Sequence, residues 1–199
     1  NSILVPTLGA MGVDYGDLNR DGYLDLAFAA VQDGENRVIN SRVYYGAAGG
    51  LDLASAVDLP TIGCADPLIA DLDKDGWPEV IFANRFRGGT PSPDTYSNNS
   101  YVYWGGPEGL SAERRLELPT VGAARSLVAD VDSDGFNDLI FANGVTDLFF
   151  ITESYVYFGS PSGWSASRRQ TLPTVFPEGM TLGLINGDAY PDLLFTTWM

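Results

Sequence analysis

The sequence contains no histidine, and cysteine and lysine occur once each, as Cys64 and Lys74. The lack of histidine excludes histidine-based catalysis and histidine-ligated zinc. A single cysteine can form neither an internal disulfide nor a cysteine metal cluster, so we expect Cys64 to be a small buried apolar residue. One lysine excludes most lysine-dependent chemistry. No apolar run is long enough to span a bilayer, so we expect no membrane insertion.

Positive charge is also scarce. The 199 residues carry 26 acids against 11 bases, a net charge of -15. Nucleic acid and anionic membrane surfaces are therefore excluded as partners, whereas cations are favoured. With 45% hydrophobic residues the chain is globular. Abundant aspartate, 23 glycines and 12 prolines indicate turns and carboxylate-lined loops.

Three markers repeat along the chain in step. They are a Tyr-aromatic-Gly tripeptide, a Pro-Thr pair and an aspartate-rich loop, each recurring after roughly 54 residues. The tripeptides are Tyr44-Tyr45-Gly46, Tyr103-Trp104-Gly105 and Tyr157-Phe158-Gly159. We interpret residues 1–199 as one domain of repeats 8–61, 62–120, 121–174 and an incomplete 175–199.

Each repeat indicates four short strands separated by turn residues. In the third repeat these are Leu127–Ala129, Leu139–Ala142, Tyr155–Phe158 and Arg169–Leu172. No segment has a sustained helical period with caps, so helix should be nearly absent. Short strands in fours at a fixed period are typical of β-propeller blades, and the chain would hold about 3.5 of them.

The strand count leaves the ring open. Ile3–Val5 is expected to be the fourth strand of a preceding blade, and the last repeat ends after its second strand at Leu193–Phe195. A closing blade would then hold only three strands. We expect a homo-oligomer that closes the propeller through the chain ends, two copies giving eight blades, in preference to a four-bladed monomer.

The aspartate-rich segments, here called Asp loops 1 to 3, place oxygen ligands at positions 1, 3, 5 and 9, with a backbone carbonyl at 7 and glycine at 6. Such a set can wrap a hard cation, and Ca²⁺ fits better than Mg²⁺ because it accepts many protein oxygens in flexible geometry. Clustered carboxylates would otherwise repel one another. The expected ligand positions are Asp17, Asn19, Asp21, Tyr23 and Asp25; Asp71, Asp73, Asp75, Trp77 and Glu79; and Asp130, Asp132, Asp134, Phe136 and Asp138.

Two details limit this assignment. An EF-hand needs a glutamate at position 12, where this chain has phenylalanine, and the flanks indicate strands, so EF-hand and dockerin are rejected. Asp loop 4, residues 184–192, has leucine at position 1 and alanine at position 6. It is expected to be empty or weak, with Asn186, Asp188 and Asp192 as its remaining ligands.

The Asp loop, the apolar strand Asp138–Ala142 and the segment Ser154–Gly159 together resemble the FG-GAP/VCBS repeat, the blade unit of integrin-α-type propellers and of many secreted bacterial proteins. The resemblance covers essentially the whole chain. It implies a propeller with a calcium loop between the first and second strands of each blade, an extracellular setting, and a role in adhesion or ligand binding. The chain begins at Asn1 with no signal peptide, so we expect it to be a mature or excised piece.

The connections between second and third strands differ most between repeats, and variable loops on a rigid scaffold favour binding. Aromatic and arginine side chains there suggest a carbohydrate or protein site, although they can also be packing residues. These candidates are Arg85, Phe86, Arg87, Tyr96, Phe149 and Phe150. The pairs Arg114-Arg115 and Arg168-Arg169 recur at one place in the repeat and are expected to be structural, and Asn98-Asn99-Ser100 is a glycosylation sequon.

These features predict an extracellular, calcium-stabilised propeller that binds a protein or glycan ligand and is not an enzyme. A polysaccharide-acting enzyme would need paired acids near a cleft, and the Asp loops already account for most clustered acids. A third alternative is a structural unit that assembles through its open ends.

Overall fold

The structure is a computed structural model that describes residues 3–144 and 152–197. It is built almost entirely from antiparallel strands, which confirms the all-β expectation. Sheet 1 has the strand order β1-β2-β3-β6 and carries a small β4-β5 hairpin. Its strands are β1 (Ala10–Gly16), β2 (Asp25–Ala30), β3 (Val38–Tyr44), β4 (Gly46–Ala47), β5 (Gly50–Leu51) and β6 (Val57–Ile62).

Sheets 2 and 3 repeat this plan, with orders β7-β8-β9-β10 and β11-β12-β13-β14. A short helix interrupts the β8–β9 connection, a 3-10 turn precedes β14, and two strands form sheet 4. The elements are β7 (Cys64–Ala70), β8 (Glu79–Asn84), α1 (Pro93–Tyr96), β9 (Ser97–Tyr103), β10 (Arg115–Val121), β11 (Ala123–Ala129), β12 (Asp138–Asn143), β13 (Thr152–Tyr157), η1 (Ala166–Arg168), β14 (Arg169–Thr174), β15 (Pro177–Gly183) and β16 (Asp192–Thr197).

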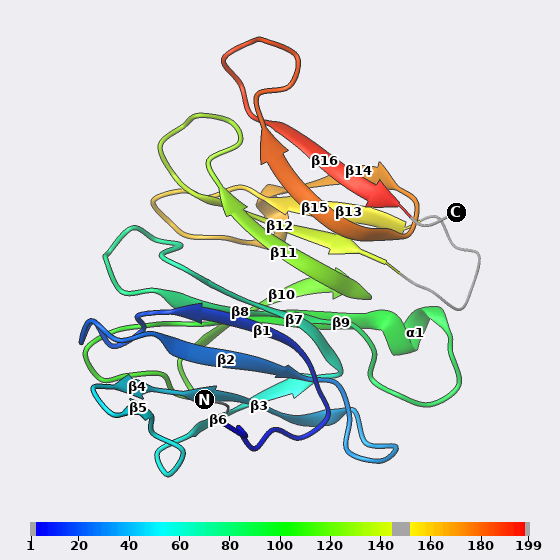
Figure 1. The fold of residues 1–199 in the computed structure, drawn as a ribbon. Helices are drawn as coiled ribbons and strands as arrows, with labels where there is room; N and C mark the ends of the chain where they lie inside the picture. The colour runs from blue at the N-terminus through cyan, green and yellow to red at the C-terminus, as the bar shows by residue number, and fades with distance from the viewer. Residues whose placement is uncertain (1–2, 145–151, 198–199) are drawn as a thin grey trace.

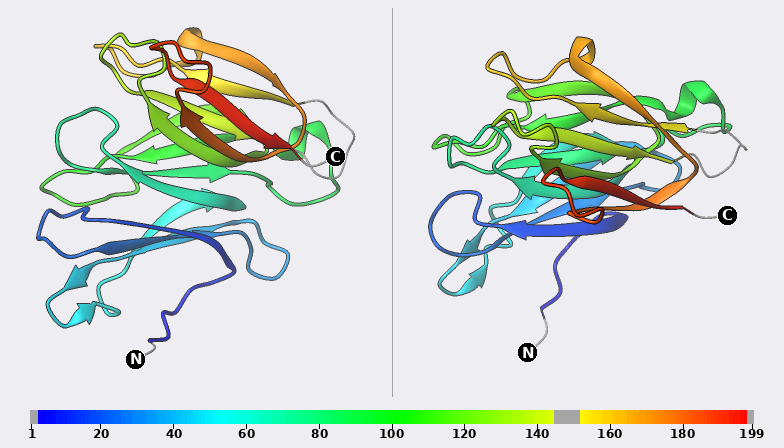
Figure 2. Two further views of the ribbon diagram at one scale, coloured as in Figure 1. Left: turned by 45° about the horizontal axis from the view of Figure 1, so that its top comes forward. Right: turned by 90° about the horizontal axis from the view of Figure 1, so that it is seen from above.

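The sheets stack in sequence order, with sheet 1 at one end and sheet 4 at the other (Figures 1 and 2). The first strand of each sheet contacts the first strand of the next, so β1 meets β7, β7 meets β11 and β11 meets β15. This face-to-face succession is the arrangement of propeller blades, but the described residues do not form a closed ring.

Burial explains why the second strands carry continuous apolar runs. Both faces of β8 and β12 are covered by neighbouring sheets, so every residue of these two strands is buried. Val80 and Phe82 face sheet 1, in one core cluster with Ala27 and Val43, whereas Ile81 packs in a second cluster toward sheet 3. The main cores therefore lie between the sheets.

The Tyr-aromatic-Gly and Pro-Thr markers join these layers. The hydroxyl of Tyr103 in sheet 2 donates a hydrogen bond of 2.5 Å to the carbonyl of Pro60, which lies on the last strand of sheet 1. Tyr157 bonds Pro119 in the same way between sheets 3 and 2. The threonine after each proline pairs with a buried serine of the third strand of its own sheet, as Ser100 and Thr120 do at 2.8 Å. One repeated dipeptide thus joins two strands and two sheets.

The expected strand at Ile3–Val5 is wrong, because this segment is not in any strand and Leu4 is 89% exposed. A strand needs a hydrogen-bonded neighbour, and no third strand of a preceding sheet lies beside it among the described residues. The segment nevertheless keeps one feature of the repeat, since Tyr44 donates its hydroxyl hydrogen bond to the carbonyl of Pro6. Pro6 therefore occupies the position that Pro60 and Pro119 occupy between complete sheets.

The inter-sheet bond makes a stability prediction. Tyr103→Phe removes the hydroxyl and leaves the Pro60 carbonyl without this partner, which should cost about 1–3 kcal/mol and lower the melting temperature by about 2–4 °C per kcal/mol. Tyr101→Phe is the matched control, because Tyr101 lies on the same strand and its hydroxyl makes no hydrogen bond within the described residues. Equal melting temperatures for the two variants would contradict the assigned role.

Candidate functional site

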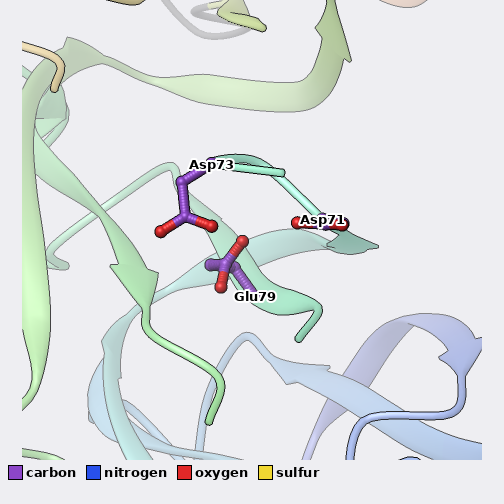
Figure 3. A group of neighbouring side chains, drawn as sticks. All are labelled: Asp71, Asp73 and Glu79. Atoms are coloured by element: carbon purple, nitrogen blue, oxygen red, sulfur yellow. The ribbon is translucent and has the colours of Figure 1, made fainter. Parts of the chain in front are cut away.

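Asp loop 2 connects β7 to β8 and brings three carboxylates together. Asp71, Asp73 and Glu79 each offer an oxygen, and these atoms all lie within 4.8 Å of one another. Figure 3 shows the three side chains converging from the loop and from the first residue of β8. Glu79 is almost fully buried, whereas Asp73 is exposed at the surface of the loop. The group therefore has a buried floor and an open side.

The backbone of the loop follows from its sequence. Lys74 and Gly76 have positive φ values of 63° and 89°, so the chain turns sharply around positions 4 and 6. The amide of Gly76 then donates to Asp71 Oδ2 at 3.1 Å, and the amide of Trp77 donates to Asp75 Oδ1 at 2.7 Å. Asp75 is thus used to hold the turn and does not belong to the group of three carboxylates.

The buried carboxylate at position 9 ties the loop to the third strand. Glu79 accepts hydrogen bonds from the amide of Leu72 at 2.7 Å and from the amide of Gly105 at 3.3 Å. This explains the glycine of the tripeptide marker, because a Cβ on Gly105 would lie 2.3 Å from the carbonyl oxygen of Pro78. Asp25 and Asp138 make the same pair of bonds in sheets 1 and 3.

Burial disfavours the charged form of these acids. Desolvation, together with repulsion from Asp73 and Asp75, raises the pKa of Glu79 to about 7. Burial likewise raises the pKa of Asp25, Asp73 and Asp138. Hydrogen bonds from the backbone offset only part of this penalty. A bound cation would supply the missing positive charge.

The unsatisfied hydrogen-bonding capacity of one carboxylate oxygen indicates whether the residues suit a cation. Asp71 Oδ1 is buried and has no hydrogen-bond partner among residues 3–144 and 152–197. In Asp loops 1 and 3 the equivalent Oδ1 atoms of Asp17 and Asp130 accept an amide hydrogen bond at 3.0 and 3.1 Å. An orphaned carboxylate oxygen beside two other carboxylates fits a hard, oxygen-preferring ion. The donor set therefore matches a divalent cation.

Asp loop 3 forms a second group of the same kind. Asp130, Asp132 and Asp138 also bring ligand oxygens within 4.8 Å of one another. The turn is again closed by amide bonds, with Gly135 donating to Asp130 Oδ2 at 2.9 Å and Phe136 donating to Asp134 Oδ1 at 2.9 Å. The structure thus reproduces the ligand cluster on two successive sheets.

Asp loops 2 and 3 also contact each other. Lys74 Nζ donates to the carbonyl of Gly135 at 2.8 Å, and Asn137 Nδ2 donates to the carbonyl of Asp71 at 3.0 Å. Between loops 1 and 2 the guanidinium of Arg20 lies over the ring of Trp77 at 5.1 Å. The loops gather on one side of the stack, opposite α1 (Figure 1). The candidate cation sites are therefore neighbours on one surface.

Asp loop 1 differs at position 3. Asn19 replaces a carboxylate there, and its amide nitrogen donates to Asp21 Oδ2 at 3.0 Å. Asp21 in turn accepts the amide of Tyr23 at 2.9 Å, as Asp75 and Asp134 do for the residues two positions later. Loop 1 keeps the turn and the buried Asp25 but offers one carboxylate fewer. At position 7 the side chains of Tyr23 and Phe136 are exposed to solvent. The ligand expected from this position is the backbone carbonyl and not the side chain.

Asp loop 4 satisfies its own polar atoms. Asn186 Nδ2 donates to Asp192 Oδ1 at 3.1 Å, and the amide of Ile185 donates to Asp192 Oδ2 at 2.7 Å. The amide of Tyr190 donates to Asp188 Oδ1 at 2.8 Å. A hydrogen-bond donor thus occupies Asp192 Oδ1, and the empty or weak site expected from the sequence stays a prediction.

The candidate ligand residues lie at the opposite end of the sheets. Arg85, Phe86 and Tyr96 line a cavity of about 230 Å³, which the β2–β3 connection completes with Arg37. Arg87 lies beside it and donates to Asn98 Oδ1 at 3.2 Å. Phe149 and Phe150 lie outside the described residues. Sequence reasoning missed Arg37, which could have been found from its place in the corresponding variable loop of the first repeat.

Three secondary expectations can be compared with the structure. Arg114 and Arg168 donate to the backbone carbonyls of Gly105 and Gly159 at 2.5 and 2.8 Å, which supports their structural role. Cys64 is fully buried, and burial raises the pKa of its thiol. Asn98 is only 4% exposed, and its amide nitrogen donates to the carbonyl of Thr95 at 3.1 Å, so the sequon is not presented for glycosylation.

Comparison with known families identifies the repeat. A family model described as FG-GAP-like repeat matches residues 17–82, which span Asp loops 1 and 2 and the strands between them. The resemblance inferred from the sequence is thus confirmed for residues 17–82. No curated protein matches the chain. No helix among the described residues is long and apolar enough to cross a membrane.

The raised pKa of Glu79 gives a pH prediction for the cation-free protein. Between its ordinary value of 4.5 and about 7, the folded state holds a proton that the unfolded state has released, so stability falls as pH rises through this window. In chelator, Glu79→Gln should therefore melt several degrees above the parent at pH 8 and close to it at pH 5. The exposed Glu108→Gln should show no such dependence. A Glu79→Gln variant that is equally destabilised at both pH values would refute the assignment.

Proposed function

We propose that the chain is an extracellular, calcium-stabilised β-propeller-type module that binds a protein or glycan ligand, as in adhesion. The observation that carries the proposal is the converging carboxylate group of Asp loop 2, which includes the orphaned oxygen of Asp71. A second carboxylate group of the same kind, without an orphaned oxygen, lies in Asp loop 3. The cation is structural in this account, because the carboxylate that closes each group also fixes the loop to the third strand.

Ca²⁺ is the cation we favour. It takes six to eight oxygens in flexible geometry, which suits carboxylates together with the backbone carbonyl at position 7. Mg²⁺ demands a near-ideal octahedron and retains waters, so it suits these protein-rich ligand sets less well. Asp loop 1, with the amide oxygen of Asn19 in place of a carboxylate, would be a third and weaker Ca²⁺ site.

Ligand binding is assigned to the end opposite the Asp loops. Two of the variable connections meet there around a cavity, and such connections on rigid sheets commonly carry recognition. An enzymatic role is not favoured. The two groups of three acids among the described residues belong to the Asp loops, where they face candidate cation sites, so these acids are not free to act as a general acid-base pair in glycan cleavage. Turnover of a polysaccharide substrate would overturn this part of the proposal.

Assembly between copies is a second candidate role. The outer face of sheet 1 carries Phe28 and Tyr44 as an edge-to-face pair with centroids 6.1 Å apart, like Phe82 with Tyr103 in sheet 2. In sheet 2 this pair is covered by sheet 1, whereas in sheet 1 Tyr44 is buried but Phe28 lines an open cavity of about 320 Å³. We propose that a sheet of a second copy covers this face. Light scattering that finds only monomer at high concentration would reject it.

The calcium proposal is tested by melting and calorimetry. Chelation should lower the melting temperature by about 5–10 °C for each site that it empties, because saturating ligand at about 100 times its dissociation constant contributes about 2.7 kcal/mol per site at about 2–4 °C per kcal/mol. Ca²⁺ should restore it and Mg²⁺ should restore less.

Calorimetry should count two or three Ca²⁺ ions, and Asp71→Asn should remove one of them. Asp188→Asn, in Asp loop 4, is the matched control and should leave the count unchanged. Identical melting curves in chelator and in Ca²⁺, or four equivalent sites, would contradict the proposal.

A further inference from the structure

The cavity opposite the Asp loops is built from two sheets. Met11 of β1 and Ala65 of β7 line it together with Arg37, Arg85, Phe86 and Tyr96. Phe86 and Tyr96 lie with their ring centroids 4.8 Å apart and their planes tilted by 34°. The cavity therefore combines a packed pair of aromatic rings with two guanidinium groups.

Arg37 has no anionic partner in the part of the chain that the structure describes. Its guanidinium carbon lies 5.5 Å from the centre of the Phe86 ring, and the side chain makes no hydrogen bond or ion pair with any described residue. The backbone is fixed, since the amide of Gly63 donates to the carbonyl of Arg37 at 2.6 Å. An ordered guanidinium stacked on an aromatic ring retains its planar set of donors for an incoming anion.

Arg85 is held back from solvent and is only loosely paired. Its side chain is 16% exposed, and its ion pair with Glu178 of β15 is 3.4 Å long. By comparison, Arg42 pairs with Asp58 at 2.6 Å. A largely buried guanidinium with a long ion pair has donor capacity left for a second acceptor. Glu178 would then compete with a bound ligand for the guanidinium of Arg85.

The charge of the cavity is opposite to that of the molecule. None of the residues lining it is acidic, although acids outnumber bases 26 to 11 in the chain. Two arginines placed here would repel a cationic ligand, and they would offer a neutral one hydrogen bonds without charge attraction. A carboxylate would meet their guanidinium groups, which match its geometry with paired N–H donors.

We propose that this cavity binds a carboxylate-bearing sugar, a uronic-acid-type residue of an acidic glycan. The carboxylate bonds to Arg37 and Arg85, and the apolar face of the sugar ring packs against the exposed side chain of Met11. The volume of about 230 Å³ suits a single ring, which carries both the carboxylate and the apolar face on one small group. This rests on the proposed ligand-binding function and does not depend on the bound cation taking part.

Calorimetric titration of the full chain in Ca²⁺ tests the proposal, with glucuronate- and galacturonate-containing oligosaccharides as probes. Neutral glucose and galactose oligosaccharides of equal length and a glutamate-rich peptide serve as comparisons. Acidic oligosaccharides should bind, and neutral ones should bind at least about tenfold more weakly, the effect expected when charge-assisted hydrogen bonds are lost.

Variants separate the roles of the side chains. Arg37→Gln should weaken binding at least about tenfold, and Glu178→Gln should tighten it by freeing Arg85. The Glu178 side chain is 45% exposed, so this variant should fold normally. Arg169→Gln is the matched control, because Arg169 also stacks on an aromatic ring, 4.0 Å from Tyr155, on sheet 3. It should leave binding unchanged.

Equal affinity for acidic and neutral sugars, preference for the peptide, no binding of acidic sugars, or normal binding by Arg37→Gln would each overturn the proposal. Melting curves with and without Ca²⁺ on the same samples distinguish failure of the sugar proposal from failure of the calcium proposal. A chain that Ca²⁺ stabilises but that binds only neutral glycans or a peptide would refute the anionic ligand and leave the proposed module intact. A chain that Ca²⁺ does not stabilise would refute the calcium account independently of the sugar result.

Discussion

The buried carboxylate at position 9 of each Asp loop is the interaction on which the repeat depends. In sheet 2 it is Glu79, which accepts one hydrogen bond from an amide of its own loop and one from the amide of Gly105, just after the third strand. This single side chain sets the position of the first, second and third strands relative to one another. The same burial that makes it an effective bridge raises its pKa to about 7 and places it beside Asp71 and Asp73. A cation relieves this electrostatic cost, so in the proposed function the metal completes the scaffold.

The Asp loops and the connections between second and third strands lie at opposite ends of the strands, so they can serve different functions. On one side, the Asp loops contact one another through Lys74 and Asn137, which makes a continuous polar surface. On the other side, the connections carry different lengths and different side chains, and α1 brings Tyr96 against Phe86. Between them, tyrosine-to-proline hydrogen bonds such as that from Tyr103 to Pro60 lock successive sheets together. A rigid centre of this kind allows one end to vary without disturbing the cation sites at the other.

The sequence predicted the strands and the Asp loops because both are local patterns. Short apolar runs between turn residues identify β8 and β12, and the spacing from Asp71 to Glu79 identifies a ligand loop. Long-range features could not be predicted. Whether Ile3–Val5 forms a strand depends on a neighbouring strand, and the role of Asp75 in holding the turn depends on the backbone path. Arg37 joins Phe86 only because two sheets stack, although the two residues are far apart in the sequence.

The central claim is that Asp71, Asp73 and Glu79 hold a divalent cation in the folded protein. The most direct measurement is a crystal structure grown in Ca²⁺ with anomalous scattering data collected to identify the ion. The account predicts an anomalous peak between the three carboxylates, within about 2.3–2.6 Å of their oxygens and of Asp71 Oδ1 in particular, with a second peak in Asp loop 3. A water molecule, a sodium ion or no density at this position in saturating Ca²⁺ would contradict it.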